Sequence, residues 1–266
     1  MITQVVFDAA ADAVVDGDEA GLKALLRAHP DLVRARSARH GATLLHYIAA
    51  NGVEDERQRT PANAVAIGQL LLDAGADSNA TADFYGAPMM TLGLLLSSGY
   101  PHQAGLQADL AEGLLDAGAD GRDALLTALA YGYGDTAEIL TRRLRVNSLP
   151  VAAGLGRVES FEAFLPDASV EDRHRAVTLA ALYGHIAILE RLAGEDLDRL
   201  NAKGFHGHAT PLHMAVWKGH EHTVRWLVER GARTDIADTV HEGTPLDWAR
   251  HEGHTAIARY LESRTI

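Results

Sequence analysis

Hydrophobic residues recur at helical spacing in short segments of this chain, and polar residues separate the segments. Leu22, Leu25 and Leu26 share one face of a helix that follows a Gly-Asp pair, and other segments repeat this pattern. Two of them end in the same motif, Gly75-Ala76-Asp77 and Gly118-Ala119-Asp120, in which glycine supplies the left-handed backbone of a helix end. The pattern predicts a series of short helices that lie in pairs.

One segment recurs in a partly altered form. Thr210–His220, with the sequence TPLHMAVWKGH, recurs 34 positions later as Thr244–His254, with the sequence TPLDWARHEGH. A period of this length indicates a stacked repeat, in which each unit buries its apolar face against its neighbours. The motifs resemble the ankyrin repeat, whose units begin with Thr-Pro-Leu-His, turn at Gly-His and end with Gly-Ala-Asp.

The resemblance implies an all-α ankyrin-repeat solenoid of about eight helix pairs with projecting β-turn or hairpin fingers. We expect a single domain over 1–266, with an amino-terminal cap at 1–39, irregular repeats with insertions at 40–174, near-consensus repeats at 175–243 and a carboxy-terminal cap at 244–266. The resemblance also implies that the side chains of Thr43 and His46, and of Thr210 and His213, hydrogen-bond within and between repeats.

The middle of the chain departs from the repeat pattern. A polar insertion follows Gly52, and Thr60-Pro61 predicts the start of the next helix because proline favours the first helical position. The third unit is expected to begin near Ala87–Met90. The short loop Gly121–Asp123 predicts that the fourth unit lacks a finger, and the sixth unit is expected to begin with Arg175 in the place of threonine.

Composition and charge narrow the function classes. The formal charge of −12 and the pI near 5.5 disfavour nucleic acids and anionic membrane surfaces as partners. No run approaches the ~18 apolar residues that span a bilayer, and no basic region precedes the first apolar patch, so we expect neither a membrane helix nor a signal peptide. The absence of cysteine excludes disulfides and thiolate chemistry and suits a cytoplasmic protein.

Histidine is abundant, with 14 copies, but most of its positions have a structural explanation. His46 and His213 stand in the repeat motif itself, so we expect a structural role for them. His185, His220 and His254 follow the glycine between two helices, as the family pattern does, and are expected to belong to the scaffold as well.

Two predicted fingers carry the histidines with the greatest chemical interest. His206 and His208 would share one face of an extended segment, and His241 and Glu242 would lie one finger away. Imidazole and carboxylate ligands suit Zn²⁺, which makes these four residues a candidate metal set. The alternatives are solvated finger tips or contacts with a protein partner.

Aromatic residues give the candidate partner-binding surface, because exposed aromatic side chains are strong anchors in interfaces. We expect several of them on first helices or fingers, and the alternative is that half or more pack against neighbouring repeats. Trp226 and Trp248 occupy positions typical of the core. The candidate partner-binding residues are Tyr47, Phe84, Tyr85, Tyr131, Tyr133, Tyr183, Phe205, His206, Trp217 and His241.

The sequence contains no nucleophile elbow, no phosphate-binding glycine loop and no HExxH motif. It therefore predicts a non-enzymatic module, without a cofactor, that binds another protein through its concave groove and finger loops. The alternative is a small-molecule-binding protein or an enzyme with a His/Tyr/Glu-lined site in the groove, with or without a metal ion.

Overall fold

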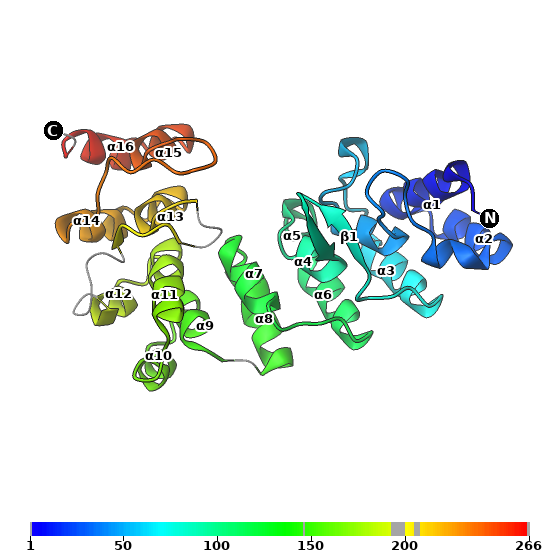
Figure 1. Cartoon of the computed structure of the whole chain (residues 1–266), viewed down its shortest axis with the longest axis horizontal. Coiled ribbons are helices and arrows are strands. Elements are labelled where there is room, and N and C mark those ends of the chain that lie inside the picture. Colours follow the sequence, from blue (N-terminus) through cyan, green and yellow to red (C-terminus); the bar gives the residue numbers. More distant parts are fainter. Residues whose placement is uncertain (1, 146, 193–199, 205–207, 265–266) are drawn as a thin grey trace. The chain divides into compact units, whose positions relative to one another are not determined.

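The computed structural model describes residues 2–145, 147–192, 200–204 and 208–264. The chain divides into two compact units, residues 1–145 and 146–266, which we call unit 1 and unit 2 and describe separately. The boundary between them falls within the stretch that the sequence marks as irregular. Helices dominate both units (Figure 1), and no helix in the described part of the chain is long and apolar enough to cross a membrane.

Unit 1 consists of short helices and one hairpin. Its elements are α1 (Gln4–Asp16), α2 (Glu19–Ala28), the 3-10 helices η1 (Pro30–Arg34), η2 (Leu44–Ala49) and η3 (Asp55–Arg57), α3 (Ala64–Asp73), the strands β1 (Thr81–Phe84) and β2 (Ala87–Met90), α4 (Thr91–Leu95), α5 (Gly99–Gln103), α6 (Gln107–Asp116), α7 (Ala124–Ala130) and α8 (Gly134–Leu144).

The first helix pair forms as the sequence predicts. The Thr3 side chain accepts a hydrogen bond from the N–H of Val6 at the start of α1, and Gly17 ends the helix with a φ of 72°. Asp18 then caps α2 by accepting from the N–H of Gly21 at 2.9 Å. The glycine that ends α1 and the aspartate that caps α2 thus produce the turn between the helices.

The insertion after Gly52 is fastened to α1 by arginine side chains. Arg57 donates to Asp12 at 2.7 Å, and Arg59 pairs with Asp16. The prediction that Thr60-Pro61 begins a helix is wrong, because α3 begins at Ala64, with Asn63 at its N-cap. The amide of Asn63 donates to the carbonyl of Gly17 at 2.9 Å, so the segment before α3 follows the surface of the first pair before it turns helical.

A two-stranded antiparallel hairpin precedes the next helix. Thr81 pairs with Met90 and Phe84 pairs with Ala87, which leaves Tyr85 and Gly86 as the two turn residues. The sequence predicted the start of a unit near Ala87–Met90, but these residues form β2 and the helix α4 begins only at Thr91. The hairpin lies against α4, which follows it directly (Figure 1).

A buried polar chain connects the helices in the second half of unit 1. Gln107 is 1% exposed, and its amide donates to the carbonyls of Leu95 at 2.9 Å and Ser98 at 3.1 Å. Its Oε1 accepts from the hydroxyl of Thr136 at 2.8 Å. Because the hydrogen-bonding groups of the Gln107 side chain are paired, these hydrogen bonds fix α6 against both α4 and α8.

Unit 2 is built from four helix pairs within its described residues. They are α9 (Leu149–Gly154) with α10 (Val158–Phe164), α11 (Val170–Leu182) with α12 (Ile186–Leu192), α13 (Pro211–Trp217) with α14 (Glu221–Glu229), and α15 (Pro245–His251) with α16 (Thr255–Glu262). Successive pairs stack on one another (Figure 1), and small alanines such as Ala180, Ala215 and Ala249 allow their first helices to approach closely.

Helix α11 differs from the prediction. The sequence placed the start of this unit at Arg175, but the helix begins five residues earlier, at Val170. Ser169 accepts a hydrogen bond from the N–H of Asp172 at 3.0 Å and supplies the N-cap that Arg175 cannot. The segment that would otherwise lead into the helix is therefore itself helical.

The threonine and histidine of the repeat motif form the predicted contacts. The N–H of Thr210 donates to Nδ1 of His213 at 3.2 Å, and Nε2 of His213 lies 3.1 Å from the carbonyl oxygen of Gly243 in the next loop. Thr43 donates to His46 in the same way at 3.1 Å. Each motif thus caps its own helix, and His213 also binds the following segment. Because both rings are buried as well, His46 and His213 have the predicted structural role.

Candidate functional site

A line of polar and aromatic side chains crosses the inter-helix turns of unit 1, and we call it the polar–aromatic row. Its members come from the turn after η2, the hairpin tip, the turn after α4, α5, the α7–α8 turn and the start of α8. Hydrogen bonds join Tyr85, Asn51, Ser97 and Tyr131, a ring contact and a hydrogen bond join Tyr133, His102 and Asp135, and Tyr131 influences Tyr133 electrostatically. The row consists of Tyr85, Asn51, Ser97, Tyr131, Tyr133, His102 and Asp135.

Tyr85 stands at one end of the row, at the tip of the hairpin. Its side chain is 74% exposed, and its backbone has a φ of 54° in a turn whose second residue, Gly86, has a φ of 78°. Two successive positive φ values define the turn type that favours Asn-Gly, so tyrosine is an unfavourable residue at this position. Its hydroxyl donates to Oδ1 of Asn51 at 2.6 Å, which fixes the direction of the exposed ring.

The middle of the row is hydrogen-bonded from one helix pair to the next. The amide of Asn51 donates to Oγ of Ser97 at 2.9 Å, and the phenol of Tyr131 hydrogen-bonds to Ser97. Asn51 and Tyr131 each directly precede a glycine with positive φ, namely Gly52 and Gly132. They therefore occupy equivalent positions at the ends of their helices, and this equivalence brings them onto one line.

The other end of the row is an aromatic and ionic cluster. The rings of His102 and Tyr133 stack with centroids 4.2 Å apart, and Nε2 of His102 lies 3.1 Å from the carboxylate of Asp135. Tyr133 follows Gly132, at the position that histidine occupies in unit 2, so a phenol replaces an imidazole here. Burial alone would raise the pKa of Asp135, but hydrogen bonds from His102 and from the N–H of Thr136 lower it overall.

The central phenols remain neutral hydrogen-bonding groups. Burial raises the pKa of Tyr131 and of Tyr133, and in each case a neighbouring tyrosine raises it further. The row therefore offers hydroxyl groups and ring faces rather than fixed charge along its middle, with carboxylates near its ends.

Both edges of the hairpin are closed to strand pairing. The N–H of Asp83 donates to the carbonyl of His40 at 3.2 Å, and the carbonyl of Thr81 accepts from Arg36 at 2.7 Å, which occupies the outer edge of β1. On β2, Pro88 lacks an N–H. A partner chain could not add a continuous strand to either edge.

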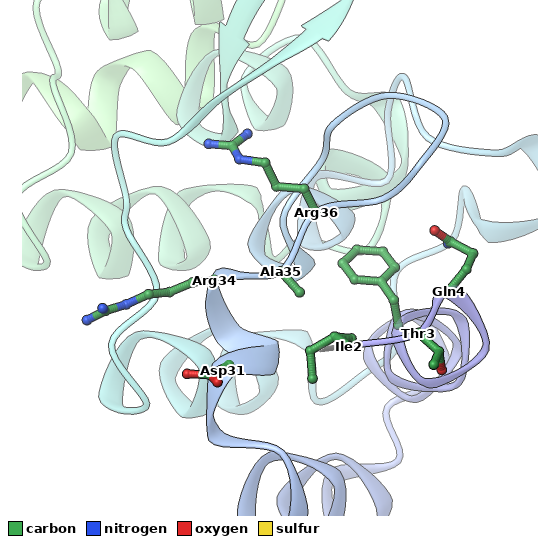
Figure 2. Close-up of a pocket in the computed structure, with 8 residues that line it drawn as sticks. Ile2, Thr3, Gln4, Asp31, Arg34, Ala35 and Arg36 are labelled. Atoms are coloured by element: carbon green, nitrogen blue, oxygen red, sulfur yellow. The ribbon is translucent and has the colours of Figure 1, made fainter.

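Two pockets in unit 1 flank the loop that precedes η2. One, of about 310 Å³, lies between the start of α1 and η1. In Figure 2 the side chains of Arg34 and Arg36 extend away from Ile2 and Thr3, so their guanidinium groups do not converge on a common point. The other pocket, of about 290 Å³, includes Tyr85 and is continuous with the polar–aromatic row.

Two predicted partner-binding residues are buried. Tyr47 is 1% exposed because η2 packs against α1, where its ring meets Phe7 edge to face with centroids 6.0 Å apart. Phe84 is 2% exposed because the alternation along β1 turns it inward, next to the ring of His46. These two residues belong to the core of unit 1, and neither offers surface to a partner.

In unit 2 the predicted aromatic residues occupy the same kind of turn. Tyr183 lies at the end of α11, with its ring stacked on His185, and Trp217 lies at the end of α13, with the ammonium group of Lys218 4.2 Å from its ring centroid. Both rings are partly buried. Trp226, which the sequence assigned to the core, is 7% exposed, and Trp248 packs against the core.

The three histidines that follow the inter-helix glycines belong to the scaffold, as predicted. Nε2 of His185 lies 3.2 Å from the carbonyl oxygen of Gly154, and Nε2 of His254 lies 3.3 Å from that of Trp217. A Cβ added at Gly184 would lie 2.9 Å from the ring of His220. Each histidine thus covers the turn of the preceding pair, and burial lowers the pKa of His185 and His220.

The described members of the predicted metal set do not form a metal site. His208 lies beside the ring of Trp248, with centroids 6.3 Å apart, while the side chains of His241 and Glu242 are exposed. Within residues 208–264 and the other described ranges, no three His, Asp or Glu side chains are grouped closely enough to hold a metal ion. Phe205 and His206 lie outside the described residues.

Sequence reasoning identified Tyr85, Tyr131 and Tyr133 but missed Asn51, Ser97, His102 and Asp135. A signal for Asn51 was present, because Asn51-Gly52 and Tyr131-Gly132 occupy the same place in the repeat. The pairing of His102 with Asp135 carried no such signal, since 33 positions separate them and they stand at different places in the repeat.

Comparison with known proteins places the repeat in unit 2. The family model of ankyrin repeats in three copies matches residues 149–238 and, in a second register, residues 177–265. The chain is 34% identical to ankyrin repeat and SAM domain-containing protein 6 of Mus musculus, and 32% identical to that of Rattus norvegicus. Each similarity spans 96 residues, which are 36% of this chain and 11% of the relative's length.

Proposed function

We propose that the chain, whose residues 149–265 match the family model of ankyrin repeats, is a non-enzymatic module that binds another protein, and that the polar–aromatic row is the centre of the contact. The hairpin β1–β2 is the finger of this surface, and the row runs from its tip along the inter-helix turns. A helix pair of unit 1 has the same kind of turn as the repeats of unit 2, since α7 and α8 meet at Gly132 with a φ of 82°, as α11 and α12 meet at Gly184 with a φ of 73°.

The observation that carries the proposal is the combination of a strained backbone and an exposed ring at Tyr85. A tyrosine with φ of 54° at an exposed hairpin tip contributes little burial to the fold and strains the turn. Tyrosine is favoured in binding surfaces because it offers a large amphipathic area with few rotatable bonds. The bond to Asn51 restricts those rotations before a partner arrives, which reduces the entropy lost on binding.

The remainder of the row has the character of an interface centre. Half-buried phenols, an amide and a hydroxyl lie on one line, and exposed Tyr100 lies on α5, two residues from His102. Aromatic side chains surrounded by polar groups carry most of the binding energy in many interfaces. The row therefore provides both anchoring area and hydrogen bonds that fix the position of a partner.

Site-specific photo-crosslinking tests this proposal. A benzoylphenylalanine at position 85 is expected to crosslink a protein that the same group at position 5 does not, although Val5 is exposed to a similar extent at 78%. The crosslinked protein is then identified, purified and titrated against Tyr85→Ala. We expect an affinity loss of roughly 10-fold or more, as for a central interface residue. Unchanged affinity in Tyr85→Ala would refute the proposal.

A further inference from the structure

Carboxylates lie beside both ends of the polar–aromatic row. The pocket of about 290 Å³ next to Tyr85 is lined by Glu54, Asp55 and Glu56 of the insertion. At the far end, the side chain of Asp135 is 71% exposed although its carboxylate contacts His102. An incoming segment would therefore meet aromatic rings between two acidic regions.

The basic residues of the insertion neutralise this pocket only in part, at Glu54. Arg57 is 12% exposed in its side chain and directs its guanidinium to Asp8, Asp12 and Glu54, while Arg59 pairs with Asp16. Asp55 accepts only from the amide of Gln58, and Glu56 has no cationic partner within the described residues. The arginines thus compensate the acidic face of α1, and two carboxylates remain without a cation.

Two basic side chains also line this acidic pocket and bear on its charge. Arg39 is exposed and lines it, and His40 lines it with its ring stacked on Phe84 at a centroid distance of 5.7 Å. With Glu54 paired to Arg57, and histidine left out of the count, the carboxylates of Asp55 and Glu56 against the guanidinium of Arg39 leave a formal charge of −1. Unit 1 as a whole carries 19 acidic and 11 basic side chains, a formal charge of −8.

We infer that the partner segment that docks on the polar–aromatic row carries an arginine, whose guanidinium lies on the ring of Tyr85 and against Asp55 and Glu56. The inference rests on the proposed function and names the chemistry of its partner. Tyr85 is 74% exposed, so a face of its ring is open to a cation. Arginine suits this site better than lysine, because its planar group stacks on a ring while its N–H groups bind carboxylates in pairs.

The probe for this inference is a flexible Gly/Ser peptide that carries two arginines and a fluorophore. Citrulline replaces arginine in the matched control peptide, which keeps the shape of the side chain and removes its charge. Fluorescence anisotropy with the full chain is expected to show binding of the arginine peptide, weaker binding of a lysine peptide and none of the citrulline peptide.

Variants of the protein distinguish specific binding at Tyr85 from a general electrostatic attraction of the basic peptide to an acidic protein. Tyr85→Ala leaves the net charge unchanged and is expected to lower the affinity for the arginine peptide roughly 3- to 10-fold. Tyr85→Asn is compatible with the turn and is expected to lower the affinity for the arginine peptide by the same factor. This result would exclude a folding defect as the cause. Glu56→Gln is expected to weaken binding more than Asp73→Asn, which removes the same charge at the end of α3, and Arg39→Ser is expected to strengthen it.

Equal effects of Glu56→Gln and Asp73→Asn, with no effect of Tyr85→Ala, would show only general attraction and would overturn the inference. Binding of the citrulline peptide as strong as that of the arginine peptide would overturn it too. If the arginine peptide does not bind while a crosslinked partner still loses affinity for the Tyr85→Ala variant, the proposed function stands and the inference of a partner arginine is wrong. If that partner is insensitive to Tyr85→Ala, the proposed function itself fails.

Discussion

The hydroxyl of Tyr85 donates a 2.6 Å hydrogen bond to Oδ1 of Asn51, 34 residues earlier in the chain. This bond joins the tip of the hairpin to the turn after η2, and the amide of Asn51 continues the connection to Ser97. An exposed side chain at a strained backbone position is therefore held in one direction. If this side chain serves the proposed binding, it does so at a cost in stability, and the two effects can be separated by experiment.

Tyr85→Asn is expected to leave the free energy of unfolding unchanged or to raise it by up to about 1 kcal/mol, because asparagine tolerates positive φ in a two-residue hairpin turn. The same variant removes the ring from the polar–aromatic row and should weaken partner binding. Urea unfolding followed by far-UV circular dichroism, with a parallel binding titration, measures both effects. A clear loss of stability would show that the ring supports the fold and would contradict this account.

Gln107→Leu is expected to destabilise unit 1 by about 2–3 kcal/mol, because Thr136 and the carbonyls of Leu95 and Ser98 lose their buried partner. Gln103→Leu, at an exposed position of α5, is the matched control and should change stability by less than about 0.5 kcal/mol. Hydrogen exchange of peptides from α6 and α8 checks the result, and equal protection in the two variants would argue against the network.

Gly184→Ala and Gly231→Ala test the stacking of histidine on the inter-helix turn. Both glycines have positive φ, but a Cβ at Gly184 would lie 2.9 Å from the His220 ring, whereas a Cβ at Gly231 would meet nothing within 4 Å. The first variant should therefore be less stable than the second by about 1 kcal/mol or more. Because Trp217, Trp226 and Trp248 all lie in unit 2, tryptophan fluorescence during urea unfolding follows this unit.

The additional variant His220→Ala supplies the control for this comparison. In its background the ring no longer opposes the new methyl group, so the two glycine substitutions should cost similar amounts. A difference that persists in the absence of the ring would assign the effect to the backbone of the turn instead.

Acid is expected to destabilise unit 1 through His46. Burial lowers the pKa of this residue from 6.5 to about 4, so the folded state binds fewer protons than the unfolded state between these values. The stabilisation from neutral His46 is therefore complete above pH 6.5 and is lost as the pH falls toward 4, by about 3 kcal/mol in total. Nδ1 of His46 accepts from the N–H of Thr43, a bond that a proton on this nitrogen would break.

The check is the pH dependence of urea unfolding, followed by circular dichroism, in the wild type and in His46→Gln. The variant should be less stable at pH 7.5, with a smaller decline between pH 6.5 and 4, because other titrating groups are common to both proteins. Parallel curves would show that His46 does not link stability to pH.

Helix caps and helix ends could be predicted from the sequence because the contacts that form them join residues only three or four positions apart. Thr210 binds His213 three positions later, and Gly17 ends α1 next to the Asp18 cap of α2. Such contacts require only the residues of one turn, so a motif is enough to predict them. The same reasoning failed at Thr60-Pro61, where Asn63 and Gly17, 46 positions apart, decide where the helix begins.

The sequence by itself thus determined the repeat, its caps and the structural histidines, since each depends on neighbours along the chain. Only the tertiary structure decided which aromatic residues are available to a partner. Phe84 and Tyr85 are adjacent in sequence, yet the hairpin buries one at 2% exposure and leaves the other 74% exposed. The polar–aromatic row follows from the stacking of turns 34 to 46 residues apart, a relationship that packing creates and that no single segment contains.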